Sequence, residues 1–470
     1  MKDCIFNNII NYNILVVSKT SFIMGLWFVL YACLIGFLFN NFYLAMVISI
    51  LGSLLIYLSN KFLPRIFTRY VVISYIIDVF CVLLLYYIYI VDFGLPYWMA
   101  GMDDYLLEKD AFRCVENGYF NVYDMINSGY SRDVLHNSKG YVILLSYLIR
   151  LGNILGGYHT LVPRIVNIFL LNLIGIILSK YLYVTECKNV DLKICKFYLF
   201  ITLFPNMIYI SAHIYRDIFN SFLVVLSFWV SYNIITVKKD KIRKILILSL
   251  ILYVSFWIRA MSIIFELWII FVLALVCKKY ADGYYYKILF LIIVVAPIVI
   301  YFIEFGLRLE QYIYAYTLSI SNNTSDFISQ IFSLPLFPYG IVLRIILYLS
   351  LPFYYKIIFN PNIWFISLTN LCYVLISIGT IYIVSQYIYI YKSIKNALDI
   401  TLIAICILFG ITLTTFGYRH VVLLYPFLMI MIYKGRISLY NNMCSLRYKI
   451  LGINIAIVFL TLFIVAFMLK

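Results

Sequence analysis

The sequence predicts an all-α, polytopic membrane protein. Of its 470 residues, 65% are hydrophobic and only 12% are charged, whereas a soluble domain has about 25% charged residues. Polar surface must cover a protein that folds in water, and this chain has too little of it. A spanning helix needs roughly 20 apolar residues, and such stretches recur from one end of the sequence to the other. Lipid is therefore the expected solvent for most of the chain.

Basic residues between the apolar stretches set the expected orientation. The net charge is +16, but the lysines and arginines form short separate clusters rather than one patch, which argues against a nucleic-acid partner. The clusters follow the positive-inside pattern of cytoplasmic loops. The largest lie at 61–69, 188–196, 238–244, 278–287 and 434–449. We expect these on the cytoplasmic side of the cell (inner) membrane, together with the N-terminus.

Keeping every basic cluster inside requires an even number of spans between neighbours. Under that rule the apolar stretches 141–155 and 341–355 become interfacial or re-entrant helices in the outer loops, and about thirteen transmembrane helices remain. Their expected bounds are 22–39, 42–59, 70–91, 158–184, 197–215, 217–236, 245–260, 262–277, 288–304, 362–391, 399–416, 421–433 and 450–469.

These spans divide the chain into three parts. Residues 1–60 hold a cytoplasmic segment and a helical hairpin, 61–305 form the core with a long acidic outer loop at 92–140, and 306–470 hold the C-terminal helices with an outer loop at 306–340. Cys114 is the one cysteine expected in a long outer loop, so no intrachain disulfide is expected there. An impermeant thiol reagent is predicted to reach Cys114 from outside.

The first outer loop concentrates carboxylates. Eight of the chain's twenty acids lie in it, an enrichment that solvation alone could explain. Asp103 and Asp104 differ from the rest because they follow a span closely. Adjacent carboxylates raise each other's pKa, so one of them could accept a proton near neutral pH. The pair could equally ligate a divalent cation through oxygen.

A third acid, Asp217, follows Arg216 in the outer turn between two spans. A charge near the bilayer is costly and suggests function by default. The alternative is a local Arg–Asp pair that caps a helical hairpin. A carboxylate at a helix N-terminus would also be stabilised by the helix dipole.

Arginines gather near the outer ends of apolar stretches, whereas most cytoplasmic clusters favour lysine. The planar guanidinium binds phosphate in bidentate fashion, which lysine cannot do. Snorkelling to lipid headgroups is the alternative for any one of them. His420 and the other three histidines also fall on the expected outer side. The candidate lipid-phosphate or substrate-binding residues are Arg164, Arg216, Arg259, Arg419 and His420.

These residues resemble those of the GT-C superfamily of membrane glycosyltransferases over roughly 70–433. The likeness rests on Asp103–Asp104 in a long outer loop, the segment 139–171, Asp217 in a later outer turn, and the Arg-His…Pro segment 417–426. The acidic loop follows the third span here rather than the first, which requires an extra N-terminal hairpin at 22–59. The chain also resembles the Wzy-type repeat-unit polymerases of O-antigen and capsule clusters, mainly in architecture.

The resemblance implies a glycosyltransferase that acts on the extracytoplasmic face in surface polysaccharide assembly. Its donor would be a polyprenyl-linked sugar or oligosaccharide, with membrane lipid and a chain-length regulator as further partners. One of Asp103 and Asp104 would act as the base, and the arginines would neutralise the departing (pyro)phosphate. Whether the enzyme is a polymerase or a monosaccharide transferase stays open. A lipid-linked oligosaccharide flippase or other transporter, and a structural or channel protein, are the competing functions.

Overall fold

The computed structural model describes residues 19–99, 102–128, 138–185, 191–237 and 239–259, parts of 262–273, and 355–358, 360–386, 389 and 418–440. Within these ranges every regular element is a helix, which confirms the all-α prediction. The predicted spans 288–304, 399–416 and 450–469 and the outer loop 306–340 lie outside the described residues, as does nearly all of the predicted helix 341–355.

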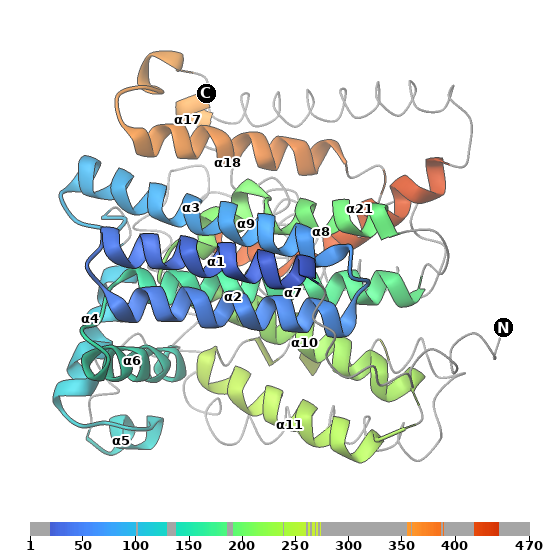
Figure 1. The fold of residues 1–470 in the computed structure, drawn as a ribbon, viewed down its shortest axis with the longest axis horizontal. Coiled ribbons are helices and arrows are strands. Elements are labelled where there is room, and N and C mark those ends of the chain that lie inside the picture. Colours follow the sequence, from blue (N-terminus) through green and yellow to red (C-terminus); the bar gives the residue numbers. More distant parts are fainter. Residues whose placement is uncertain are drawn as a thin grey trace, which may run out of the picture.

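Long antiparallel helices form the bundle and lie side by side (Figure 1). Five of them, α2, α3, α7, α10 and α18, are long and apolar enough to cross a membrane, and a bent pair, α8 and α9, would make a sixth. The count of about thirteen stays a prediction. The bounds are α1 Lys19–Leu38, α2 Phe42–Phe62, α3 Phe67–Phe93, α7 Leu161–Thr185, α8 Asp191–Thr202, α9 Pro205–Ser211, α10 Asp217–Thr236, α11 Lys241–Ile258 and α18 Leu368–Ser385.

The predicted span 197–215 is broken rather than continuous. Helix α8 ends at Thr202, α9 begins at Pro205, and their axes meet at 51°. Proline has no N–H to give to the preceding turn and clashes with its carbonyl, so it is tolerated only at the start of a helix. The break therefore follows from Pro205. Hydropathy averaged over a window does not detect such a break, because one proline changes the average very little.

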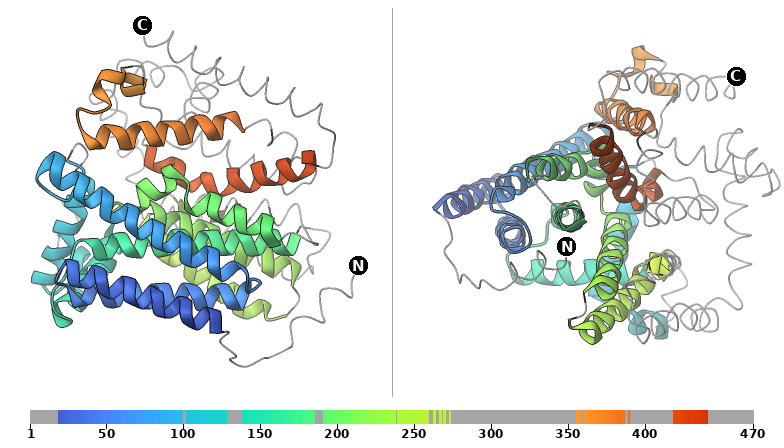
Figure 2. Two further views of the ribbon diagram at one scale, coloured as in Figure 1. Left: turned by 45° about the horizontal axis from the view of Figure 1, so that its top comes forward. Right: turned by 90° about the vertical axis from the view of Figure 1, so that its right-hand side faces the viewer.

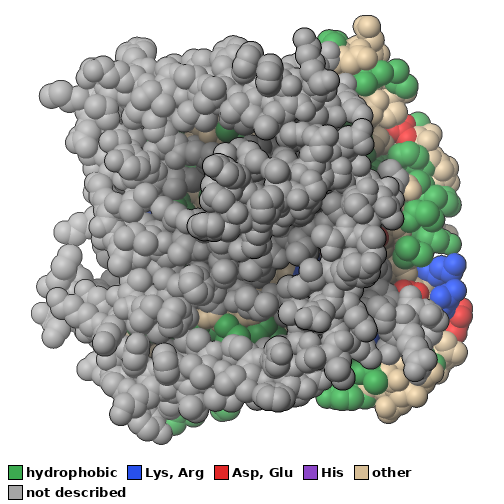
Figure 3. Space-filling view, turned by 180° about the vertical axis from the view of Figure 1, so that it is seen from behind, with side chains coloured by type: hydrophobic (Ala, Val, Ile, Leu, Met, Phe, Trp, Pro, Cys, Tyr) green, Lys and Arg blue, Asp and Glu red, His purple; other side chains and the backbone are tan. Residues whose placement is uncertain are grey.

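One end of the bundle carries three shorter helices, α4 (Asp103–Glu116), α5 (Val122–Asn127) and α6 (Lys139–Ile154), which gather at the left of Figure 1. Helix α6 confirms the helix expected at 141–155, although its place relative to a membrane stays a prediction. Figure 3 shows this α4–α6 end at its right-hand edge, with hydrophobic, basic and acidic side chains close together. Lys109, Phe112 and Arg113 are exposed there.

The buried face of α4 corrects one expectation. Cys114 has no exposed surface, because α4 packs this face against α6. A thiol reagent is thus not expected to reach Cys114 in the folded protein. The acidic segment that was predicted as an outer loop contains the amphipathic helix α4, so membership of a predicted loop does not mean exposure.

Basic residues lie at both ends of the bundle. Lys61, Arg65 and Arg69 lie at or beside the connection from α2 to α3, and Lys239 and Lys241 lie at the connection from α10 to α11, both at the end opposite the α4–α6 end. The α4–α6 end also carries basic residues beside its acids, namely Lys109, Arg113, Lys139, Arg150 and Arg164. The orientation expected from the positive-inside pattern therefore stays a prediction.

Helix α18 lies to one side of the bundle with α21 (Tyr425–Tyr440), as both views in Figure 2 show. Asp92, at the end of α3, caps the start of α18, since its Oδ2 accepts from the Thr369 backbone N–H at 2.8 Å and from the Thr369 hydroxyl at 2.6 Å. The predicted span 421–433 begins in a 3-10 helix, η6 (Tyr418–Leu423), and continues as α21. Two short helices, α17 (Tyr355–Ile358) and η5 (Pro361–Ile363), precede α18.

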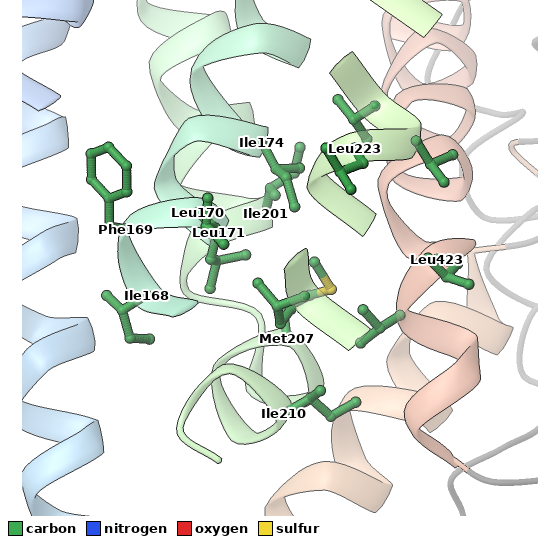
Figure 4. Packing of buried hydrophobic residues seen from close by; sticks show 14 of the residues in the cluster. Ile168, Phe169, Leu170, Leu171, Ile174, Ile201, Met207, Ile210, Leu223 and Leu423 are labelled. Carbon is green, nitrogen blue, oxygen red and sulfur yellow. The ribbon is translucent and has the colours of Figure 1, made fainter. Parts of the chain in front are cut away.

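Helix α7 is the centre of the core. In its most apolar stretch 83% of the residues are buried, because it packs against α2, α3, α8 and α10. Figure 4 shows Leu171 and Ile174 of α7 close to Ile201 of α8 and Met207 of α9. A helix that is apolar on every side is buried on every side. Among the five described helices that are long enough to span a membrane, α7 has the largest buried share, so the residues at its start are firmly positioned.

Candidate functional site

Helix α4 places Asp103 and Asp104 in its first turn, where carboxylates are favoured by the helix dipole. The two acids then differ. Asp103 is half-buried, whereas Asp104 has no exposed surface. The Asp104 carboxylate accepts from the backbone N–H of Tyr105 at 3.1 Å and from that of Trp98 at 3.5 Å. Asp104 is thus the carboxylate that is fixed in the interior.

Burial raises the pKa of Asp104 from 3.8 to about 6, while the charge of Arg164 and the backbone N–H bonds act in the opposite direction. The expected cause was the neighbouring Asp103, and that explanation is wrong, because burial is the dominant cause. A carboxyl group with a pKa near 6 is partly protonated near neutral pH and can take up or release a proton. This property belongs to Asp104 rather than to the dipeptide.

Arg164 stands at the start of α7 and has no exposed surface. Its Nη2 donates to the carbonyl of Pro96, and its guanidinium lies 5.8 Å from the centre of the Tyr86 ring. Its Nε and Nη1 have no hydrogen-bond partner among the residues that the structure describes. Each buried donor without a partner costs about 1–3 kcal/mol, and more when charged. Arg164 therefore retains two N–H groups that an anionic ligand could use.

His159 lies beside Arg164 in the turn before α7. Burial, reinforced by the charge of Arg164, lowers the pKa of His159 to about 4. Its Nδ1 accepts from the backbone N–H of Leu161 at 3.1 Å. The ring is therefore neutral at physiological pH and caps the start of α7 rather than adding a second positive charge.

Glu108 belongs to this site, although the sequence analysis did not single it out. It follows Asp104 by one turn of α4 and is 2% exposed. Its carboxylate accepts from the hydroxyls of Tyr97 and Tyr158, and from the Thr160 hydroxyl at 3.1 Å. The i, i+4 spacing of the two acids puts them on one face of a helix. That spacing was the available signal, and it was hidden among the loop's other carboxylates.

Asp217 begins α10 and pairs with Arg259. The Arg259 Nη1 lies 3.0 Å from the Asp217 Oδ1, and their side chains are 11% and 5% exposed. Arg216 donates to the hydroxyl of Ser138. The alternative of a local Arg216–Asp217 pair capping the hairpin stays a prediction. Because Arg259 is already held by a carboxylate, it is less available for a phosphate than the sequence suggests.

Helix α6 connects the elements around these acids. It packs against α4, which carries Asp104 and Glu108, against α7, which carries Arg164, and against α11, which ends next to Arg259. Its Tyr141 is buried, and burial raises the pKa of that hydroxyl, with a smaller contribution from the charges of Asp217, Glu108 and Asp104. Asp104, Arg164, Glu108 and Asp217 thus gather at the α4–α6 end, although they come from distant parts of the sequence.

The remaining predicted residues are less well defined. Arg419 and His420 lie in η6, which packs against α9 and α10, but their side chains lie outside the described part of the structure. No group of three His, Cys, Asp or Glu that could hold a metal occurs among the described residues. The divalent cation that the Asp103–Asp104 pair could bind, according to the sequence, therefore has no such group of three ligands within the described ranges.

No protein-family model matches this chain, and no curated protein or solved structure matches it.

Proposed function

We propose that the chain is a membrane glycosyltransferase of the repeat-unit polymerase kind. It would transfer a sugar or oligosaccharide from a polyprenyl (pyro)phosphate carrier to an acceptor hydroxyl on the extracytoplasmic face of the cell membrane. The α4–α6 end would face outward, and the N-terminus would be cytoplasmic. The chemistry would belong to surface polysaccharide assembly, as the resemblance implies.

One observation carries the proposal: a carboxylate and an arginine with complementary tasks lie together in the interior of the α4–α6 end. Asp104 has a pKa of about 6, and the nearby Arg164 has two N–H groups without a partner. Transfer of a glycosyl group needs a base for the acceptor hydroxyl and positive charge for the departing phosphate. If the acids served only to solvate a loop, or if the arginine only bound lipid headgroups, their side chains would be exposed rather than buried.

In the proposed reaction Asp104 takes the proton of the acceptor hydroxyl. The acceptor oxygen bonds to the anomeric carbon of the donor sugar, and the bond from that carbon to the (pyro)phosphate oxygen breaks. Arg164 would bind the phosphate that leaves. Glu108 would keep Tyr97 and Tyr158 in place around the pair, and the Asp217–Arg259 pair would fix α10 to α11 beside it.

A second candidate is a flippase for a lipid-linked oligosaccharide. The broken pair α8–α9 favours it, because discontinuous helices with ionisable residues nearby are typical of transporters. Transfer is preferred because the buried base and the unpartnered arginine lie at one end of the bundle rather than in its middle.

The test is the length of surface glycan chains in cells that carry single variants at equal protein level. Asp104→Asn is expected to abolish long chains, because loss of a general base costs about 10²–10⁴-fold in rate. Asp124→Asn is the matched control: Asp124 caps the first turn of α5, and asparagine keeps an oxygen that can accept the same hydrogen bonds, so this variant should leave chain length unchanged. Normal chains with Asp104→Asn would reject the proposal. Loss of all surface glycan, with lipid-linked units accumulating on the inner leaflet, would favour the flippase.

A further inference from the structure

A second polar cluster lies inside the bundle, away from the α4–α6 end. Asp78 sits near the middle of α3, and it is completely buried together with Ser74, Asn172 of α7, and Tyr198 and Thr202 of α8. Asn172 Nδ2 donates to Asp78 Oδ2 at 2.8 Å, and Tyr198 donates its hydroxyl to Asn172 Oδ1. A charged residue within a spanning helix is rare and suggests function by default.

No salt bridge joins Asp78 to any of the described residues. Among the described residues, neither its Oδ1 nor the hydroxyl of Tyr75, one helical turn away, has a hydrogen-bond partner. An isolated carboxylate in a low-dielectric interior is very unfavourable unless it is neutralised. Either a proton or a bound cation must therefore neutralise Asp78.

The neighbouring hydroxyls serve the other carboxylate oxygen. Thr202 donates to the carbonyl of Tyr198 at 3.0 Å. Ser74 lies within donor distance of the Thr202 hydroxyl, at 2.6 Å, and of Asp78 Oδ2, at 3.3 Å, and its single proton serves one of them at a time. Asp78 Oδ1 is therefore the oxygen to which none of the described side chains donates.

The break between α8 and α9 adds more negative charge at the same place. Helix α8 ends at Thr202, and a helix C-terminus carries roughly half a negative elementary charge. The Ser74–Thr202 contact brings that end against the cluster. In membrane transporters, unwound backbone and half-helix C-terminal ends coordinate small cations at such breaks.

We propose that Asp78, Tyr75, Ser74 and Thr202 form a binding site for a small monovalent cation of the sodium class, at the break between α8 and α9. Oxygen atoms are the ligands that hard cations prefer, and these four residues offer only oxygen. One bound charge balances one carboxylate. A bound cation would neutralise Asp78 and take as ligands Asp78 Oδ1 and the Tyr75 hydroxyl, both of which lack a partner among the described residues. The site is independent of the proposed transferase chemistry.

The test compares the thermal stability of the purified full-length protein in NaCl and in choline chloride at equal ionic strength. A ligand that binds the folded state alone raises Tm in a saturable manner, here by at least about 2 °C. Asp78→Asn removes the charge and is expected to abolish this response. Asp124→Asn on α5, the matched control with the same chemical change, should keep it.

Tyr75→Phe keeps the ring and removes one oxygen, so it provides a second test should Asp78→Asn fail to fold. It is expected to raise the half-saturating Na⁺ concentration about five-fold, a loss of roughly 1 kcal/mol of binding. Equal Tm values for the wild type in NaCl and choline chloride would overturn the site. So would a Tm that depends on pH but not on Na⁺, since that result would assign a proton to Asp78.

Discussion

The Asp217–Arg259 pair allows a quantitative test of how the candidate site is held. The two charges meet at 3.0 Å, and both side chains are nearly buried. At an effective dielectric constant of about 20, charges some 4 Å apart attract by about 4 kcal/mol. Replacing Arg259 by methionine keeps most of the volume but leaves Asp217 buried without this partner. We expect the free energy of unfolding to fall by about 3–5 kcal/mol.

A double-mutant cycle isolates the contribution of the pair. Asp217→Asn, Arg259→Met and the double variant are unfolded with denaturant in detergent, and the unfolding free energies are compared. The double variant should lose less than the sum of the single variants, by at least about 2 kcal/mol, because the second substitution removes the charge whose ion-pair partner the first one removed. Coupling within about 0.5 kcal/mol of zero would refute the pair as a structural element, and Arg259 would return as a candidate phosphate ligand.

Three further predictions concern the α4–α6 end. If ionised Asp104 is the base, activity should fall as pH drops through about 6. Because burial raises its folded pKa from 3.8, the contribution of Asp104 to stability is largest below pH 3.8 and is lost, by roughly 3 kcal/mol, as pH rises through 6. The difference in unfolding free energy between the wild type and Asp104→Asn should therefore change with pH over this range in pH-dependent denaturation. Arg164→Lys should reduce glycan elongation more than about ten-fold at equal protein level, because lysine lacks the planar guanidinium that binds phosphate in bidentate fashion. Arg113→Lys, at an exposed position, is the control and should not reduce it. Equal activity of the two variants would show that Arg164 serves packing rather than phosphate binding. Lys109→Cys, on the exposed face of α4, should react with an impermeant thiol reagent applied from outside, while Cys114 stays protected. Labelling of this variant only after permeabilisation would place the α4–α6 end on the cytoplasmic side.

The fold class and most of the described helix positions were predictable because both depend on hydropathy summed over about twenty residues. The expected spans 42–59, 70–91, 158–184 and 217–236 coincide with α2, α3, α7 and α10 to within a few residues. The break at Pro205 was not predicted, because window hydropathy does not register the loss of a single N–H.

The site was predictable only in part. Asp104, Arg164 and Asp217 were found as charges at the ends of apolar stretches, and all three lie at the α4–α6 end. The pairing of Asp217 with Arg259 was not predicted, because the two residues lie 42 positions apart. Glu108 was not predicted as a site residue, because it is one acid among eight in its loop. Which carboxylate is buried, and hence which one has the raised pKa, depends on the packing of α4 against α6, a tertiary contact that adjacency in sequence does not report.

Sugar transfer by the purified protein is the most direct test of the central claim. The protein is reconstituted in liposomes with a polyprenyl-pyrophosphate-linked oligosaccharide, and products are separated by length. The account predicts that the wild type forms elongated glycan and releases polyprenyl pyrophosphate, and that Asp104→Asn forms at least about 10²-fold less product while Asp124→Asn forms as much as the wild type. Unchanged oligosaccharide that has merely crossed to the other leaflet, or equal product from Asp104→Asn, would contradict it.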